Sequence, residues 1–128
     1  VNTAGLLITA QVFGPKMVAA GEGSIVVTGN TAALRGRPDY VGWAPTKAAQ
    51  RILAEALARD LGPQGVHVAY VVIDAVINMP FARRRRVIED ESKLAQPDDL
   101  AAEIYRIAHQ PGSAQSFYVE LRPLSEPW

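Results

Sequence analysis

Apolar residues follow two patterns along the chain, a helical spacing and consecutive runs that are typical of buried strands. Helical spacing covers residues 3–20 and 45–61, and a third helix is predicted from Pro97 onward. Pro15 should end, kink or tighten the first helix near its last turn, whereas Pro45 suits the first turn of the second. Gly62-Pro63 is the expected stop of that second helix. The apolar positions are Leu6, Leu7, Ala10, Val12, Phe13, Met17 and Val18, then Ile52, Leu53, Ala56, Leu57 and Leu61 on one face, then Leu100, Ile104 and Ile107.

Three further segments have the pattern of strands. Residues 24–28 and 66–73 are consecutive apolar runs, which are typical of strands covered on both faces in parallel sheets. Phe117, Val119 and Leu121 alternate with other residues and predict a last strand, while residues 74–96 are irregular or weakly helical. Because helices alternate with parallel-type strands, the predicted class is α/β, with a parallel sheet between helical layers.

A sheet of three strands is thin for this architecture. If the strands follow their sequence order in space, the first strand has one bare edge, which intact proteins avoid. The chain also begins with Val1 rather than Met, inside what has the pattern of a structural element. We therefore expect residues 1–128 to be a partial domain whose missing strands pair at that edge.

Composition narrows the function classes. The chain has 48% apolar and 20% charged residues, and 13 basic residues balance 13 acidic ones. This neutral balance argues against a general nucleic-acid or acidic-membrane binder. With no cysteine and only two histidines, we expect no disulfide, no cysteine nucleophile and no metal site. No signal peptide and no apolar run of about 18 residues is visible, so we expect no membrane partner and a cytoplasmic location.

The expected ligand crevice lies beyond the carboxyl ends of the parallel strands. Those ends are residues 28–30 and 74–77, and the start of the second long helix faces the first of them. Trp43 and Lys47 are four residues apart there and should project on one helix face. A lysine at a helix start opposes the helix dipole, and an ordinary solvent-facing lysine is the competing interpretation.

Three segments, 23–28, 38–49 and 57–68, closely resemble the short-chain dehydrogenase/reductase superfamily. The resemblance continues through Phe117–Pro123 and covers nearly the whole chain, with several motifs in the right order. It implies the C-terminal half of a doubly wound Rossmann domain, with the last three strands and their flanking helices. It also implies an oxidoreductase that uses NAD or NADP on alcohol or carbonyl substrates. Its glycine-rich phosphate turn and its NAD-or-NADP selector would lie upstream of Val1.

In this superfamily a tyrosine is the general acid/base, and a lysine four residues later binds the ribose and lowers the tyrosine's pKa. A serine thirteen residues before the tyrosine holds the substrate oxygen. An asparagine on the preceding helix anchors a water that feeds the lysine. By position the resemblance assigns the lysine to Lys47 and the asparagine to Asn2.

The other two positions depart from the superfamily's pattern. Trp43 stands at the tyrosine position and Asn30 at the serine position. An indole N–H is a donor without useful acidity, so Trp43 cannot act as general acid/base, whereas the Asn30 amide can still polarise a carbonyl. Tyr40 is a weaker alternative acid, since it would need a different backbone path. A divergent branch that ends in a similar segment, here Glu120–Pro123, shows comparable losses, and the chain resembles it.

The segment after the second strand also departs. Asp74-Ala75 stand where the superfamily has Pro-Gly, and Met79 stands where a threonine would hold the nicotinamide carboxamide. Val76 and Ile77 are the expected backbone contacts to the cofactor. Asp74 either caps a turn or is a displaced acid. The basic run 83–86 falls at the superfamily's mobile substrate lid, either as a solvated face or as a contact to an acidic substrate.

Two functions follow from these assignments. The first is an oxidoreductase of this superfamily, impaired by the loss of tyrosine and serine, and inactive as 128 residues alone. The second is a non-catalytic member that serves ligand sensing or assembly, which Trp43, Asn30 and Met79 favour. The resemblance also implies a homodimer or tetramer through helices 3–20 and 45–61, with Ala48, Ala54 and Ala58 allowing close approach. A freestanding three-stranded module is disfavoured by its exposed edge.

Overall fold

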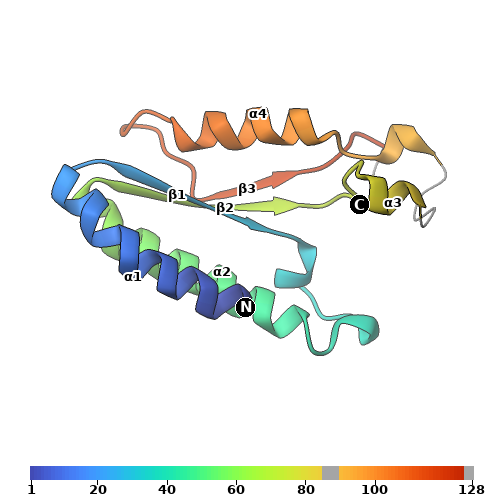
Figure 1. Ribbon diagram of the computed structural model, residues 1–128, viewed down its shortest axis with the longest axis horizontal. Helices are drawn as coiled ribbons and strands as arrows, with labels where there is room; N and C mark the ends of the chain where they lie inside the picture. The colour runs from blue at the N-terminus through green and yellow to red at the C-terminus, as the bar shows by residue number, and fades with distance from the viewer. Residues whose placement is uncertain (85–89, 126–128) are drawn as a thin grey trace.

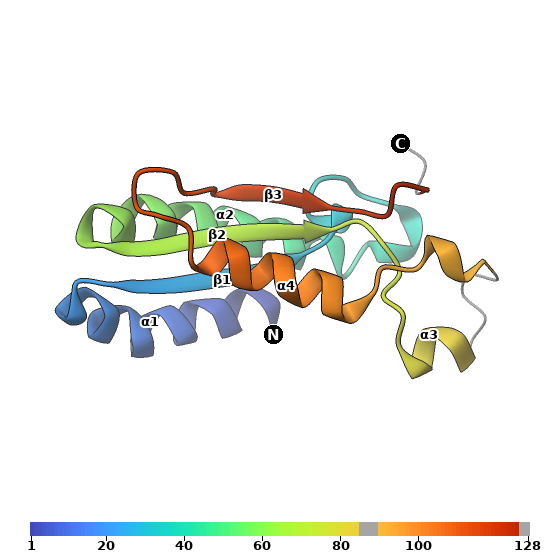
Figure 2. The same ribbon diagram turned by 90° about the horizontal axis from the view of Figure 1, so that it is seen from above.

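The computed structural model describes residues 1–84 and 90–125, which form a parallel sheet between two layers of helices (Figure 1). The strands β1 (Gly23–Gly29), β2 (Val66–Ile73) and β3 (Tyr118–Leu121) lie side by side in that order (Figure 2). Helices α1 (Asn2–Ala20) and α2 (Ala44–Leu61) cover one face, and α4 (Pro97–Ala108) covers the other. The predicted three-layer α/β fold is confirmed.

The central strand β2 organises the core. All its residues from Val66 to Val72 are buried, as the continuous apolar run predicts. Because side chains alternate along a strand, Val68 and Tyr70 pack toward α1 and α2 with Ile25 and Leu61, while Val71 packs with Ile107 of α4. Burying a side chain such as Ile107 contributes about 1.5–3 kcal/mol.

Two left-handed glycines join the helices to the strands that follow them. Gly21 (φ 73°) ends α1, and its N–H donates to the carbonyl oxygen of Val18. Gly65 (φ 88°) forms the turn between α2 and β2. These turns let each helix fold back along the sheet, so the carboxyl ends of β1 and β2 reach the same edge as the start of α2.

The buried face of α2 differs from the predicted one. Ile52 and Ala56 are exposed, whereas Ala54 is fully buried and Gln50 is buried beside it. Ala54 packs inside this chain's own core, so the small residue brings α2 close to its own sheet rather than to another subunit. Helical spacing alone could not separate the two faces, because apolar residues occur on both.

Pro15 does not end α1, which continues for five more residues to Ala20. The proline lies on the solvent-exposed side of the helix, next to the exposed Lys16. Pro15 lacks the N–H that would bond the carbonyl oxygen of Gln11, and Gln11 is itself an exposed residue.

The connecting segments hold short helical turns. The loop after β1 contains turns at Thr31–Ala33 and Pro38–Tyr40, and the segment after β2 contains α3 (Pro80–Arg84) and a turn at Glu91–Lys93. Arg85 and Arg86 of the predicted lid lie outside the described residues. Within residues 1–84 and 90–125, no strand pairs with the outer edge of β1, and no helix is long and apolar enough to cross a membrane.

Candidate functional site

Lys47 lies where the start of α2 meets the carboxyl end of β1. Its Nζ donates to the carbonyl oxygen of Thr28, 3.2 Å away, and to Oε1 of Gln50, 3.0 Å away. Partial burial of this ammonium lowers the pKa of Lys47 from its ordinary value. The two oxygens offset the unfavourable helix dipole at this position, so Lys47 is held in place rather than being a freely solvated lysine.

Asn2 is joined to Lys47 through Gln50. Nε2 of Gln50 donates to the backbone oxygen of Asn2 at 3.2 Å, while its Oε1 accepts from Lys47. The Asn2 side chain donates through Nδ2 to Oγ1 of Thr46 at 3.0 Å, and that hydroxyl donates to the Trp43 carbonyl oxygen at 2.7 Å. The start of α1 is thereby tied to the start of α2, and both predicted residues belong to one polar cluster.

Gln50 was missed by sequence reasoning, although one signal was present. It is a polar residue three positions after Lys47, at a helix position that turns out to be buried. A buried amide needs partners for both ends, and Gln50 finds them in Lys47 and Asn2. Residues three apart lie on one helix face, so this spacing would have pointed to the pair.

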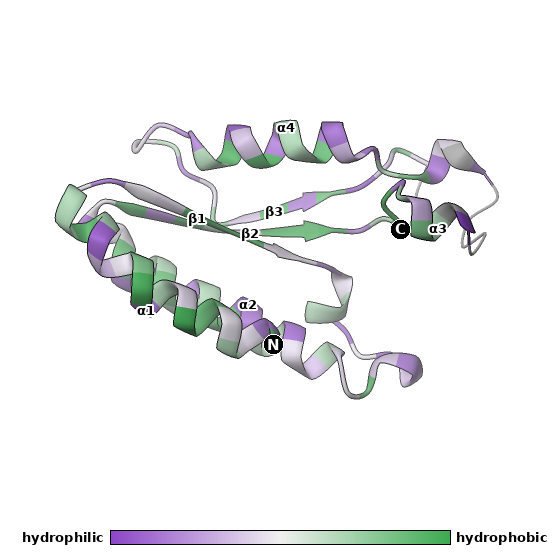
Figure 3. Ribbon diagram, in the orientation of Figure 1, coloured by the Kyte–Doolittle hydropathy of each residue, from purple (hydrophilic) through white to green (hydrophobic). Residues whose placement is uncertain are grey.

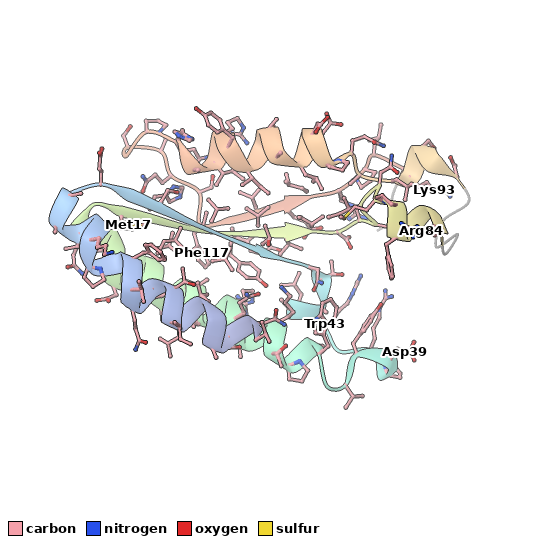
Figure 4. The ribbon with its side chains drawn as sticks, viewed as in Figure 1. Met17, Asp39, Trp43, Arg84, Lys93 and Phe117 are labelled. Atoms are coloured by element: carbon pink, nitrogen blue, oxygen red, sulfur yellow. The ribbon has the colours of Figure 1, made fainter. Side chains whose placement is uncertain are left out.

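A pocket of about 270 Å³ opens at the carboxyl ends of β1 and β2. We call it the carboxyl-end pocket. It is lined by Asn30–Ala32, Arg35, Arg37, Tyr40 and Trp43 from the loop after β1, and by Ile73–Val76 after β2. Trp43 and Asp39 lie at this end of the molecule, far from Met17 on α1 (Figure 4).

Asn30, Trp43 and Tyr40 all reach this pocket. The Tyr40 and Trp43 rings are 5.5 Å apart and tilted, forming one aromatic wall. Oδ1 of Asn30 accepts from the Ala32 N–H at 3.2 Å, and none of the described contacts uses its Nδ2 amide. Asn30 can therefore offer an N–H to a ligand, and the turn at Pro38–Tyr40 brings a phenol beside the indole.

Lys47 is not among the residues that line the pocket, although it lies one turn after Trp43. Two of its three N–H donors are used by Thr28 and Gln50, so one remains for a ligand hydroxyl. Trp43 precedes α2 as its N-terminal flanking residue rather than lying within it. The side chains of Trp43 and Lys47 therefore lie in adjacent regions and do not line one pocket together.

The residues after β2 are held by the neighbouring chain segments. Asp74 lies 3.6 Å from the Arg122 guanidinium, and its N–H donates to the Leu121 carbonyl oxygen. The Val76 carbonyl accepts from the Ala95 N–H at 3.0 Å, and Ile77 forms a parallel bridge with Ala95. Val76 lines the carboxyl-end pocket, and the exposed Met79 does not.

The sequence of this chain is similar to those of known proteins. A family model described as short chain dehydrogenase matches residues 1–85. A short-chain dehydrogenase of Penicillium ochrochloron is 36% identical over 104 residues, covering 80% of this chain and 38% of that protein. An oxidoreductase of Sarocladium schorii is 36% identical over 67 residues, covering 52% of this chain and 27% of that protein.

Solved structures of other proteins have a similar fold. A short-chain dehydrogenase from Rhodopseudomonas palustris is 34% identical with a TM-score of 0.64, over 84% of this chain and 41% of that one. A serine dehydrogenase complexed with NADP+ has a TM-score of 0.81 at 21% identity, over 99% of this chain and 54% of that one. At that identity the likeness shows the fold alone. The chain spans less than half the length of the two relatives above and about half of this second solved chain.

Proposed function

The chain belongs to the short-chain dehydrogenase family, and from this membership we propose that it forms the substrate and nicotinamide side of an oxidoreductase. The proposed cofactor is NAD or NADP, and the proposed substrate is an alcohol or carbonyl compound. The polar cluster at Lys47, next to the carboxyl-end pocket, is the observation that carries this proposal. The substitution of Trp43 for the expected tyrosine leads us to propose that catalysis is impaired.

The residues present suit the nicotinamide end of such a cofactor. When bound, the nicotinamide would accept or supply a hydride. Lys47 has one N–H left for a ribose hydroxyl, and the backbone of Val76 and Ile77 lies at the carboxyl end of β2. Asn30 would orient a substrate oxygen through its amide, while Gln50 and Asn2 would hold the lysine.

Proton transfer is the step that Trp43 cannot perform. An indole N–H neither releases nor takes up a proton near neutral pH, so Trp43 can only pack against a ligand or donate a hydrogen bond. Tyr40 lines the same pocket and stands as the alternative acid. Asp74 lies 3.6 Å from the Arg122 guanidinium and serves there as an ion-pair partner.

Trp43 also favours a second candidate function. A family member that keeps the lysine cluster but lacks the acid could bind a nicotinamide nucleotide or a small ligand without turnover. It would then serve ligand sensing or assembly. Binding without turnover is the outcome that separates this function from the first.

We further propose that residues 1–128 correspond to the C-terminal half of the family domain. The chain covers 38% and 41% of the length of two relatives, which supports a partial domain. So does the outer edge of β1, which has no partner strand among residues 1–84 and 90–125. A glycine-rich turn from outside residues 1–128 would complete the cofactor site.

The test uses the intact protein and two measurements. Calorimetric titration with NADH and NADPH reports binding, and absorbance at the nicotinamide band reports turnover with a panel of alcohols and ketones. We expect binding with slow or undetectable turnover, and an increase of at least ten-fold in turnover in a Trp43→Tyr/Asn30→Ser variant. Lys47→Ala should weaken nicotinamide binding, while the exposed Lys16→Ala serves as the matched control. The proposed function would be contradicted if neither NADH nor NADPH bound.

A further inference from the structure

The carboxyl-end pocket carries an excess of positive charge that the chain as a whole does not have. Arg35 and Arg37 both line the pocket, although the 13 basic and 13 acidic residues of the chain balance. Among the described residues, neither guanidinium makes an ion pair. Asp74 is the acid that lines the pocket, and its carboxylate faces Arg122 at 3.6 Å. The pocket therefore presents two uncompensated guanidinium groups to a ligand.

These two arginines stand between two hollows. The second hollow, of about 530 Å³, shares Arg35, Arg37 and Tyr40 with the carboxyl-end pocket. Its other lining is mostly apolar and includes Leu34, Val41 and Pro45. A ligand whose charged group lies at the arginines can thus place a polar neighbour toward Asn30 and an apolar substituent in the second hollow.

The chemistry of the lining suits an anionic group with a further oxygen beside it. A guanidinium remains charged at any physiological pH and presents paired N–H donors that match a carboxylate. The free Nδ2 donor of Asn30 suits a carbonyl or hydroxyl oxygen near that carboxylate. The Tyr40–Trp43 wall adds an apolar surface for a flat body.

We propose that this site binds a small oxo or hydroxy acid, with Arg35 and Arg37 holding its carboxylate and Asn30 its neighbouring oxygen. The inference rests on the proposed function for its assignment as a substrate site, but the binding of the acid stands on the arginines and the pocket. The two hollows, of about 270 Å³ and about 530 Å³, suit a small molecule.

The experiment compares matched acids and esters. Benzoylformate and 4-methyl-2-oxopentanoate, each beside its methyl ester, are titrated calorimetrically into the intact protein, alone and with NADPH present. We expect the acids to bind at least ten-fold more tightly than the esters. Raising the salt concentration should weaken binding of the acids and leave that of the esters unchanged.

Substitutions test whether the charges of Arg35 and Arg37 hold the acid. Arg35→Gln/Arg37→Gln should weaken binding of the acids about ten-fold and leave the esters unchanged, since it removes two charge-assisted hydrogen bonds. Arg59→Gln, an exposed arginine on α2 that pairs with Glu55, is the matched control and should change nothing. Both arginines of the pocket are exposed, so circular dichroism should show an unchanged fold.

The outcomes separate the two proposals. Equal binding of acids and esters, or a loss in the double variant that falls equally on both, overturns the inference. A double variant that weakens NADPH binding but not acid binding also overturns it, because the arginines then serve the cofactor. If neither nucleotide binds but arginine-dependent acid binding persists, the inference stands and the proposed function fails.

Discussion

Gln50 connects two residues that the family resemblance assigns separately. Its amide accepts from the Lys47 ammonium and donates to the Asn2 carbonyl oxygen. The resemblance implies that the asparagine anchors a water that feeds the lysine, and Gln50 adds a direct connection through its buried side chain. Gln50 is therefore a positioning residue for Lys47, because it holds the ammonium toward the carboxyl end of β1.

Removing this amide should change the titration of Lys47. In Gln50→Leu the ammonium loses one oxygen partner while remaining partly buried, so we expect the pKa of Lys47 to fall further below 10.5 than in the natural protein. NMR titration of the Lys47 ε-methylene group measures it. Gln64→Leu, an exposed glutamine whose amide donates to the Asp60 carbonyl, is the matched control. An unchanged or higher pKa in Gln50→Leu would show that the contact does not hold the charge.

The same shift couples Lys47 to stability. Because the pKa of Lys47 is lowered on folding, the unfolded chain binds more protons than the folded chain between the folded pKa and the ordinary value of 10.5. The contribution of Lys47 to the free energy of unfolding therefore increases as pH rises through that interval. Below the folded pKa, where both states are protonated, burial of the ammonium is a constant cost.

At the scale of elements, the turns at Gly21 and Gly65 limit how α1, α2 and β2 come together. A Cβ on Gly65 would lie 2.5 Å from the Gly21 carbonyl oxygen, and Gly65 also has a φ of 88°. The end of α1 and the turn before β2 are thus in contact, and a side chain at Gly65 would push them apart. Glycine is required here for its conformation and for the close approach.

Gly65→Ala should lower the free energy of unfolding by about 1–3 kcal/mol, because it combines left-handed strain with a backbone clash. Gly5→Ala is the matched control, since Gly5 lies inside helix α1, is exposed, and a Cβ added there would meet open space. It should be neutral or stabilising by up to about 1 kcal/mol. Urea denaturation followed by circular dichroism measures both. Equal effects of the two substitutions would contradict the contact between the turns.

The elements were predictable to different degrees. The bounds of β2 agree with the predicted 66–73, and α2 begins one residue before the predicted 45. These segments have strong apolar patterns and clear glycine or proline ends. The short α3 and the buried face of α2 were not predicted, because neither has a distinctive pattern of its own. Burial of Ala54 depends on what the helix packs against, which local spacing does not contain.

At the scale of the whole molecule, α1 presents apolar side chains to solvent. Leu7, Ile8, Val12 and Phe13 are all exposed, and hydrophobic colours mark the helix in Figure 3. A groove of about 590 Å³ runs between α1 and α2, lined by Leu7, Val18 and Leu57 among others. Exposed apolar surface of this kind marks contact sites, and the predicted partner is a second copy through α1 and α2.

Charge on this surface should prevent that association. An Ile8→Lys/Phe13→Lys variant is expected to weaken self-association at least ten-fold, because it places two charges in the contact. Analytical ultracentrifugation of the intact protein over a concentration series measures it. Ala101→Lys/Ala102→Lys adds the same charge on exposed positions of α4, in the opposite layer, and should have no effect. A natural protein that sediments as a monomer at every concentration would contradict the predicted partner.

The sequence by itself determined the order of the elements and the parallel sheet, since periodicity and motif spacing are local properties. It also predicted Lys47, Asn2, Asn30 and Trp43 as candidate site residues. Only the tertiary structure decided which of these side chains meet. Gln50 bonds to Asn2, 48 positions earlier in the chain, and thereby joins it to Lys47. Tyr40, Trp43 and Asp74 share a pocket although they come from two different loops. Such contacts depend on how α1 and α2 pack against the sheet, and no local pattern encodes that distance.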